Sequence, residues 1–407
     1  MLRTIQFACM LPKAEADALN RESGRVYSNM LIWHYRFYRR LGIWLAPKNG
    51  ERLEDALGGQ TTLHAHSRDA AQQGFYKACK TAKACQKVGL DSAYPHKRKR
   101  YRTTIWKQTG IHLKAGLLLL ARTHGLTPVS LVLPPHLLTL PANAFIEVRL
   151  VWDRVASHYT WHVVVQDGST PEQAPGSKMA AVDLGEIHPA ALTDGKEALI
   201  ISCRALRANQ QYTAKRLAEL KACQDQKHKA SRRWKRLQRR KQQFLAKQRR
   251  RARDMEHKIS RAIVTWAKAY KIGTLAVGDV RNIANKKRHN STSQQKIGVW
   301  SHGRQSQYLM YKAEAAGINT IFINEAYTSQ TCPECQQRSK PQGRRYACPA
   351  CGFVAHRDAV GSANILSLAL HRQVGQIKPP LIQKYRHPFQ AGKRSRLDTP
   401  DLAWYIR

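Results

Sequence analysis

Two Cys-x-x-Cys pairs form the most specific chemical pattern in the sequence. They are Cys332/Cys335 and Cys348/Cys351, with twelve residues between the pairs. This spacing allows two short knuckles to present four thiolates to Zn²⁺ in a tetrahedron, with sulfur–zinc distances of about 2.3 Å. Because four protein ligands leave no open coordination position, such an ion is structural and not catalytic. We therefore predict a structural zinc site at these four cysteines.

Acidic residues at the ends of predicted elements could serve a second, catalytic metal centre. Asp183 follows an apolar run at residues 179–182, and Asp358 precedes a helix-like segment. Cleavage of a phosphodiester by two Mg²⁺ ions requires carboxylates that converge from different elements and hold the ions about 3.5–4 Å apart. Glu325 and Asp358 lie on opposite sides of the cysteine cluster in the sequence. The zinc module is therefore expected to fix these two acids in one geometry.

The composition predicts a polyanionic partner. The chain has 407 residues, and 69 Lys and Arg against 27 Asp and Glu give a formal charge of +42. An excess this large is typical of proteins that bind nucleic acid. A membrane partner is not expected, because the most apolar stretch, residues 116–121, is far too short to span a bilayer. The nine cysteines and the absence of a signal-peptide pattern favour a reducing compartment, the bacterial cytosol or nucleoid.

The first half of the chain divides into helical and β-rich parts. A strand is expected at residues 2–10, an amphipathic helix at 15–41 and a second helical segment at 62–88. Residues 95–102 are a basic run containing Tyr101, which suits phosphate contacts and stacking on bases.

The remainder of the first half reads as a small barrel or sandwich. Between residues 103 and 167, short β-branched and aromatic runs alternate with polar turns. The Gly/Ser/Pro-rich linker at 167–178 is the predicted domain boundary.

The second half reads as an α/β sheet with insertions. Strands are expected at 179–183, 190–193, 198–202, 272–280 and 319–324. Helices are expected at 205–256, 257–270, 307–316 and 361–370, followed by a loosely ordered tail.

One helical segment is intensely basic. Fourteen Lys or Arg residues and no acid lie between Lys227 and Arg253. A solvated coiled-coil arm is one interpretation of this segment. A helix that faces nucleic acid explains the lopsided charge better, and we favour it.

Three motifs of the second half occur together: AVDLG at residues 181–185, TSQTCPEC at 328–335, and HRD at 356–358 with ANI at 363–365. In this combination they resemble the TnpB family, transposon-encoded relatives of the type V CRISPR effectors. The resemblance covers essentially the whole chain and is most specific from Met179 onward. It implies an RNase H-like (RuvC) nuclease domain of α/β class with a zinc-ribbon insertion. It also implies an N-terminal wedge β-barrel that carries a helical recognition insertion.

The resemblance suggests a domain scheme for the chain. It comprises a wedge barrel (1–11 and 95–170), a helical recognition domain (12–94), a RuvC nuclease (171–204, 257–330 and 353–370), a basic helical insertion (205–256), a zinc ribbon (331–352) and the tail (371–407).

One departure from the family pattern concerns the catalytic acids. The family usually has a Glu at the end of the strand seen here near Val277, but this chain has Gly278 followed by Asp279. Glycine offers no side-chain ligand, and successive residues of a strand point to opposite faces. Some members of the family and the eukaryotic Fanzor proteins have a relocated glutamate, and Gly278 with Glu325 resembles that arrangement.

The resemblance therefore implies catalytic, Mg²⁺-binding roles for Asp183, Glu325 and Asp358, with Asp279 as the competitor of Glu325. Glu186 is expected to be a turn residue. His257 and His356 are expected to pack or hydrogen-bond.

The implied function is that of an RNA-guided DNA endonuclease with two Mg²⁺ ions and one Zn²⁺. It would act as a monomer on a guide RNA from the transposon end and cut double-stranded DNA next to a short motif. Two alternatives remain: a nuclease-inactive, RNA-guided DNA-binding repressor, and a non-guided zinc-ribbon DNA-binding protein that assists transposition.

Overall fold

The structure is a computed structural model, and it describes residues 2–280, 298, 300–380 and 383–386. The chain forms two compact units, Met1–Ser169 and Thr170–Arg407. The boundary between them in the sequence falls inside the predicted linker at 167–178. None of the described helices is long and apolar enough to cross a membrane.

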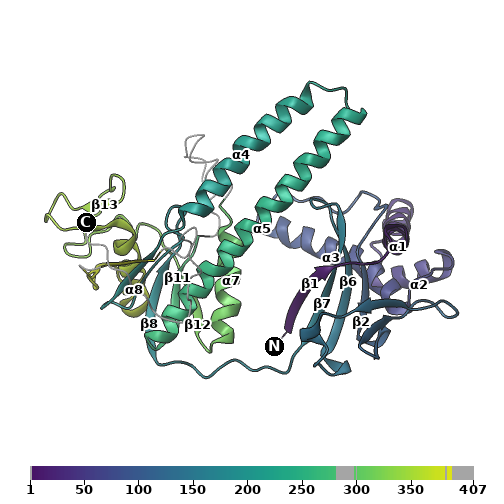
Figure 1. Ribbon diagram of the computed structural model, residues 1–407, viewed down its shortest axis with the longest axis horizontal. Helices are drawn as coiled ribbons and strands as arrows, with labels where there is room; N and C mark the ends of the chain where they lie inside the picture. Colours follow the sequence, from purple (N-terminus) through teal and green to yellow (C-terminus); the bar gives the residue numbers. More distant parts are fainter. Residues whose placement is uncertain (1, 281–297, 299, 381–382, 387–407) are drawn as a thin grey trace. The chain divides into compact units, whose positions relative to one another are not determined.

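The first unit begins with a strand and three helices, coloured purple to blue in Figure 1. These are β1 (Leu2–Ala8), α1 (Lys13–Leu41), α2 (Pro47–Leu57) and α3 (Ala65–Lys87). Helix α2 has no counterpart among the predicted elements. It is held by Glu54, whose fully buried carboxylate accepts hydrogen bonds from Arg68 (2.8 Å), Gln72 (2.9 Å) and Asn29 (3.1 Å).

The rest of the first unit consists of two antiparallel sheets with strand orders β1-β7-β6-β2 and β3-β4-β5. Buried side chains from both sheets, among them Trp106, Leu118 and Val163, form one hydrophobic core. Its further elements are β2 (Thr104–Lys107), η1 (Gln108–Gly110), β3 (Ile111–Lys114), β4 (Leu117–Leu120), β5 (Val129–Val132), η2 (Pro135–Leu137), η3 (Ala142–Ala144), β6 (Phe145–Asp153) and β7 (His158–Gln166).

The second unit is built on a sheet with strand order β12-β11-β8-β9-β10-β15. Strands β8, β9 and β10 form an antiparallel meander, whereas β11 pairs in parallel with both β8 and β12. The carboxyl ends of β8, β11 and β12 therefore lie at one edge of the sheet. The strands are β8 (Lys178–Asp183), β9 (Ala190–Thr193), β10 (Ala198–Ile201), β11 (Ile272–Gly278), β12 (Asn319–Ile323) and β15 (Gln383–Arg386).

Helices cover both faces of this sheet. Helix α8 (Arg357–His371) packs on one face, where Ile365 contacts Ala181 and Ala276. Helices α5 (Arg232–Ala269) and α7 (His302–Ala315) cover the other face. Each strand consequently alternates between a face that contacts α8 and a face that contacts α5 and α7.

Helix α5 pairs with α4 (Arg204–Asp225) as a long helical hairpin (Figure 1). The predicted break at residues 256/257 is wrong, because α5 runs through it without interruption. No Gly or Pro occurs between residues 232 and 269 to end the helix. Residues 232–256 of the predicted insertion and the apolar helix predicted after it are therefore parts of one continuous helix, α5. The helix predicted at 205–256 is itself interrupted by the turn between α4 and α5.

Two further boundaries differ from the predictions. The zinc module extends past residue 352, since β13 (Arg345–Ala347) pairs with β14 (Val354–His356). The tail is not structureless throughout, because β15 pairs in parallel with β10. The predicted loose tail at 387–407 lies outside the described residues.

Candidate metal centres

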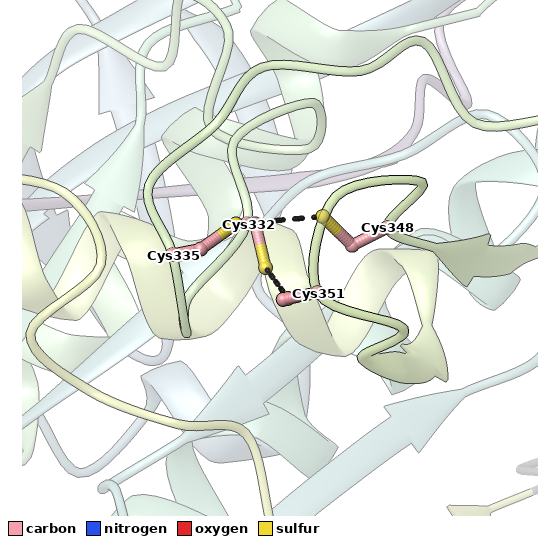
Figure 2. A group of neighbouring side chains, drawn as sticks. All are labelled: Cys332, Cys335, Cys348 and Cys351. Atoms are coloured by element: carbon pink, nitrogen blue, oxygen red, sulfur yellow. Dashed lines mark hydrogen bonds between the residues drawn. The ribbon is translucent and has the colours of Figure 1, made fainter.

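The four predicted cysteines converge in the folded chain, as Figure 2 shows. The sulfurs of Cys332 and Cys351 are 3.6 Å apart, and those of Cys335 and Cys348 are 3.5 Å apart. A tetrahedron with sulfur–zinc distances near 2.3 Å has sulfur–sulfur edges of about 3.8 Å. The site therefore fits Zn²⁺, and no disulfide joins these four residues.

A buried asparagine attaches the cysteine module to helix α8. The Asn364 side chain donates hydrogen bonds to the carbonyl oxygens of Thr328 and Thr331, both at 2.8 Å, and accepts one from the Gly375 N–H at 3.0 Å. Thr328 in turn donates its side-chain hydroxyl to the carbonyl of Glu325 at 2.9 Å. Asn364 thus links α8 to the turn that follows Glu325.

Strand alternation places the predicted acids on the face that contacts α8. On β8, Ala181 faces α8, so Asp183 two residues later does the same. On β12, Ile321 and Ile323 face α8, and Glu325 continues this series.

Gly278 lies between these two acids. In the parallel register Val277 pairs with Val182 and Gly278 pairs with Ile323. A methyl group added at Gly278 would clash with Oε2 of Glu325. The Glu325 carboxylate therefore occupies the space into which a side chain at position 278 would project.

Asp279 lies one residue beyond the end of β11. Its backbone N–H donates to the carbonyl of Ile323 at 2.8 Å. Val280 packs in the same cluster as Val277, so the strict alternation of β11 does not continue past Gly278. That the Asp279 side chain is directed away from α8 therefore stays a prediction.

Asp183 is surrounded by negative charge and by the backbone of α8. Burial and the neighbouring carboxylates of Glu325 and Asp358 raise the pKa of Asp183 well above its usual value. A Cβ atom at Gly361 would lie 2.5 Å from Oδ2 of Asp183, so a larger residue there would require the carboxylate or the helix to shift. Acids that lie close together repel one another when they are ionised. A divalent cation bound between them would neutralise this charge.

Asp358 is at the start of α8, where basic side chains hold it. Its oxygens accept hydrogen bonds from Nδ1 of His188 at 2.6 Å and from Arg344 at 2.8 and 3.0 Å. Burial opposes ionisation, but His188 and Arg344 together lower the pKa of Asp358. His356 caps the helix by accepting the Asp358 N–H at 3.2 Å.

A second group of potential metal ligands consists of His188, His356 and Asp358, whose ligand atoms lie within 4.8 Å of one another. Asp183 and Glu325 are not part of this group. Asp358 is thus directed toward basic partners, and binding Mg²⁺ together with the other two acids would require it to exchange some of these contacts.

The structure places the remaining predicted residues in non-ligand environments. Glu186 forms an ion pair with Arg207 at 3.0 Å. His257 stacks on Tyr308, with ring centroids 4.0 Å apart. His188 and Arg344 were not predicted as site residues. A histidine five residues after Asp183 and an arginine between the cysteine pairs were the only signals, and neither has a specific spacing.

Substitution of Asn364 by Ala should weaken the attachment of the cysteine module to α8. The change removes the amide partner of two carbonyls and one N–H, which costs roughly 2–4 kcal/mol. Hydrogen exchange of residues 325–335 should rise, and the urea midpoint should fall. Ser362→Ala is the matched control, because Ser362 is equally buried but bonds only within its own helix. Equal effects of the two substitutions would contradict the proposed role of Asn364.

Removal of zinc should loosen the start of α8 as well as the cysteine module. The reason is that Arg344 contacts the Asp358 carboxylate, and its carbonyl accepts the Arg357 N–H at 2.8 Å. Metal analysis should find one Zn²⁺ per chain. Chelation or Cys335→Ser should increase hydrogen exchange at residues 332–360 but not in α1. The exposed Cys223, changed to Ser, serves as the control. Unchanged exchange at residues 354–360 after zinc loss would contradict this coupling.

Comparison with known proteins extends these observations. Residues 162–284 match the family model described as "Probable transposase", and residues 302–365 match "Cas12f1-like, TNB domain".

Two curated relatives illustrate the similarity. The TnpB-like protein MJ0751 of Methanocaldococcus jannaschii is 27% identical over 142 residues, which are 34% of this chain and 50% of that protein. The CRISPR-associated endodeoxyribonuclease Cas12f1 of Sulfoacidibacillus thermotolerans is 34% identical over 114 residues, 27% of this chain and 25% of that protein. The matches thus span half or less of these relatives.

A solved structure agrees in fold. The Cas12f1–sgRNA–target DNA complex contains a chain that superposes with a TM-score of 0.55 at 14% identity, covering 87% of this chain and 83% of that chain. Together with the four-cysteine cluster, these matches show that the chain resembles TnpB-like and Cas12f1-like proteins over residues 162–284 and 302–365.

Proposed function

We propose that the protein is an RNA-guided DNA endonuclease that hydrolyses phosphodiester bonds with two Mg²⁺ ions. The observation that carries this proposal is the Glu325 carboxylate, which occupies the space left by Gly278 and lies close enough to Asp183 to raise its pKa. These two acids and Asp358 come from β8, the turn after β12 and the start of α8. They therefore form a set of the kind that two-metal hydrolysis requires.

The strand order supports an RNase H-like (RuvC) nuclease domain. An antiparallel meander, β8-β9-β10, is extended by two parallel strands, and the acids lie at the carboxyl edge of the parallel part. In open α/β sheets this edge is the usual position of functional sites.

Asp183, Glu325 and Asp358 would hold the ions. Bound Mg²⁺ activates a water nucleophile and stabilises the leaving oxygen. The residues of the chain position these groups: Gly361 allows α8 to approach Asp183, and Asn364 fixes the turn after Glu325. If Asp358 held a metal ion in place of its contacts with Arg344, that guanidinium would be available to a negatively charged substrate.

Guide RNA from the transposon end and double-stranded target DNA are the proposed partners, bound by a protein monomer in the bacterial cytosol. Two observations support this proposal. The chain has a formal charge of +42, and most of the basic segment between residues 227 and 253 lies on the long helix α5. Base pairing with the guide would provide sequence specificity, and the protein would recognise a short flanking motif.

A nuclease-inactive, RNA-guided repressor is the second candidate function. Gly278 is the observation that favours it, because the carboxylate that the family usually has at this position is missing. The third candidate is a zinc-ribbon DNA-binding protein that assists transposition. Unlike the other two, it would bind DNA without a guide RNA.

The activity should depend on Glu325 and not on Asp279. We expect Glu325→Gln to lower DNA cleavage by the protein–RNA complex more than about a hundredfold, because several kcal/mol of metal-mediated stabilisation are lost. Asp279→Asn is the matched carboxylate-to-amide control at the residue that follows Gly278, and its rate should remain within a few-fold of wild type. The measurement is single-turnover cleavage in Mg²⁺ of DNA with a randomised flank.

The opposite pattern, loss in Asp279→Asn only, would assign the third acid to Asp279. RNA-dependent binding without cleavage by the wild-type complex in any divalent ion would favour the repressor. Binding that survives RNase treatment would leave the accessory protein.

A further inference from the structure

A basic cavity lies next to the Asp358 site. It has a volume of about 670 Å³ and is bounded by the β8–β9 loop, the end of β10, the first turns of α4 and the cysteine module. Its basic side chains are Arg204, Arg207, Arg344 and His188. No carboxylate is among the described residues that line it. The size is within the roughly 300–1,000 Å³ typical of ligand sites.

Two of the arginines that line the cavity form ion pairs with acids that do not line it. Arg207 pairs through Nε with Glu186 at 3.0 Å, and Arg344 pairs through Nη1 with Asp358 at 2.8 Å. A guanidinium has five N–H donors, so each arginine keeps donors that its carboxylate does not use. Arg204 is the first residue of α4, at the helix end that carries partial positive charge.

These groups suit a phosphate. Guanidinium groups bind phosphate oxygens in a bidentate geometry and remain charged at all physiological pH values. His188 and Arg344 contact both the cavity and the Asp358 carboxylate, so a ligand in the cavity would lie directly beside the proposed scissile site. A polymer with phosphates at regular spacing could occupy the cavity and the metal centre at once.

We propose that Arg204 and Arg207 in this cavity bind a backbone phosphate of the DNA strand being cut, adjacent to the scissile phosphate. The inference rests on the proposed nuclease function and adds substrate-positioning residues to it. It explains why the start of α4 and the β8–β9 loop, neither of which supplies a predicted acid, meet beside Asp358.

The first test pairs protein and DNA changes. Arg204→Gln/Arg207→Gln should slow single-turnover cleavage about tenfold, as expected for lost charge-assisted contacts. One uncharged methylphosphonate at a phosphate flanking the cut should slow the wild-type complex to a similar extent but have little further effect on the double variant. Arg216→Gln is the control: Arg216 is also on α4, is similarly exposed (39% against 30% for Arg207) and pairs with Glu219.

Multiplicative effects of the protein and DNA changes would overturn the proposal. The proposal would also be overturned if a methylphosphonate in the guide RNA gave the non-additive effect and one in the DNA did not. The cavity would then bind RNA. An effect of Arg216→Gln as large as that of the double variant would also overturn it.

A second test does not depend on cleavage. Phenylglyoxal modification of the full chain, read by mass spectrometry, should show that a twelve-residue thymidine oligonucleotide protects Arg204 and Arg207 more than Arg216. Its uncharged methylphosphonate analogue should give no such protection. If cleavage is absent but protection is found, the proposed function fails and the phosphate site stands; equal protection of Arg204, Arg207 and Arg216 overturns the site itself.

Discussion

The candidate catalytic centre depends on a steric exchange between Gly278 and Glu325. The two positions are on neighbouring parallel strands or just beyond them, and the carboxylate of Glu325 fills the volume that a Cβ atom at position 278 would need. A side chain at 278 would force the Glu325 carboxylate to leave its present position. The glycine therefore leaves room for this position of the Glu325 carboxylate. The other elements of the second unit keep this pair close to Asp183.

The cysteine module stabilises the same region from outside the sheet. It enters through the turn after Glu325 and leaves into the first turn of α8, which carries Asp358. Asn364 connects the entry to the helix, and Arg344 connects the module to Asp358 itself. Zn²⁺ bound by four thiolates would have no open catalytic position, so its contribution would be to hold these two segments together.

The elements near the site were largely predictable, because their signals are local. Apolar runs that end on acids predicted strands β8 and β12, and the cysteine spacing predicted the cluster that the structure shows. Strand alternation predicted that Gly278 and Asp279 are directed to opposite faces, and the choice of Glu325 over Asp279 as the third acid stays a prediction. The roles of Asp183, Glu325 and Asp358 as metal ligands stay predictions.

Features that depend on tertiary contacts were missed. Helix α2 is held by Glu54 through partners on α1 and α3, and β15 is defined by its pairing with β10, so neither has a strong local pattern. His188 and Arg344 have meaning only because distant segments of the chain bring them to Asp358. The basic cavity at the start of α4 arises in the same way, from three segments that are separate in the sequence and that no periodicity connects.

The most direct test of this account exchanges the two positions. Glu325→Ala should abolish single-turnover DNA cleavage, and Gly278→Glu alone should reduce it, because the new side chain competes with Glu325 for one space. The double variant Gly278→Glu/Glu325→Ala should recover at least about tenfold over Glu325→Ala, which corresponds to roughly 1.4 kcal/mol of restored stabilisation. A folded, zinc-loaded double variant no more active than Glu325→Ala, or a Gly278→Glu variant as active as wild type, would contradict the exchange of one carboxylate position for the other.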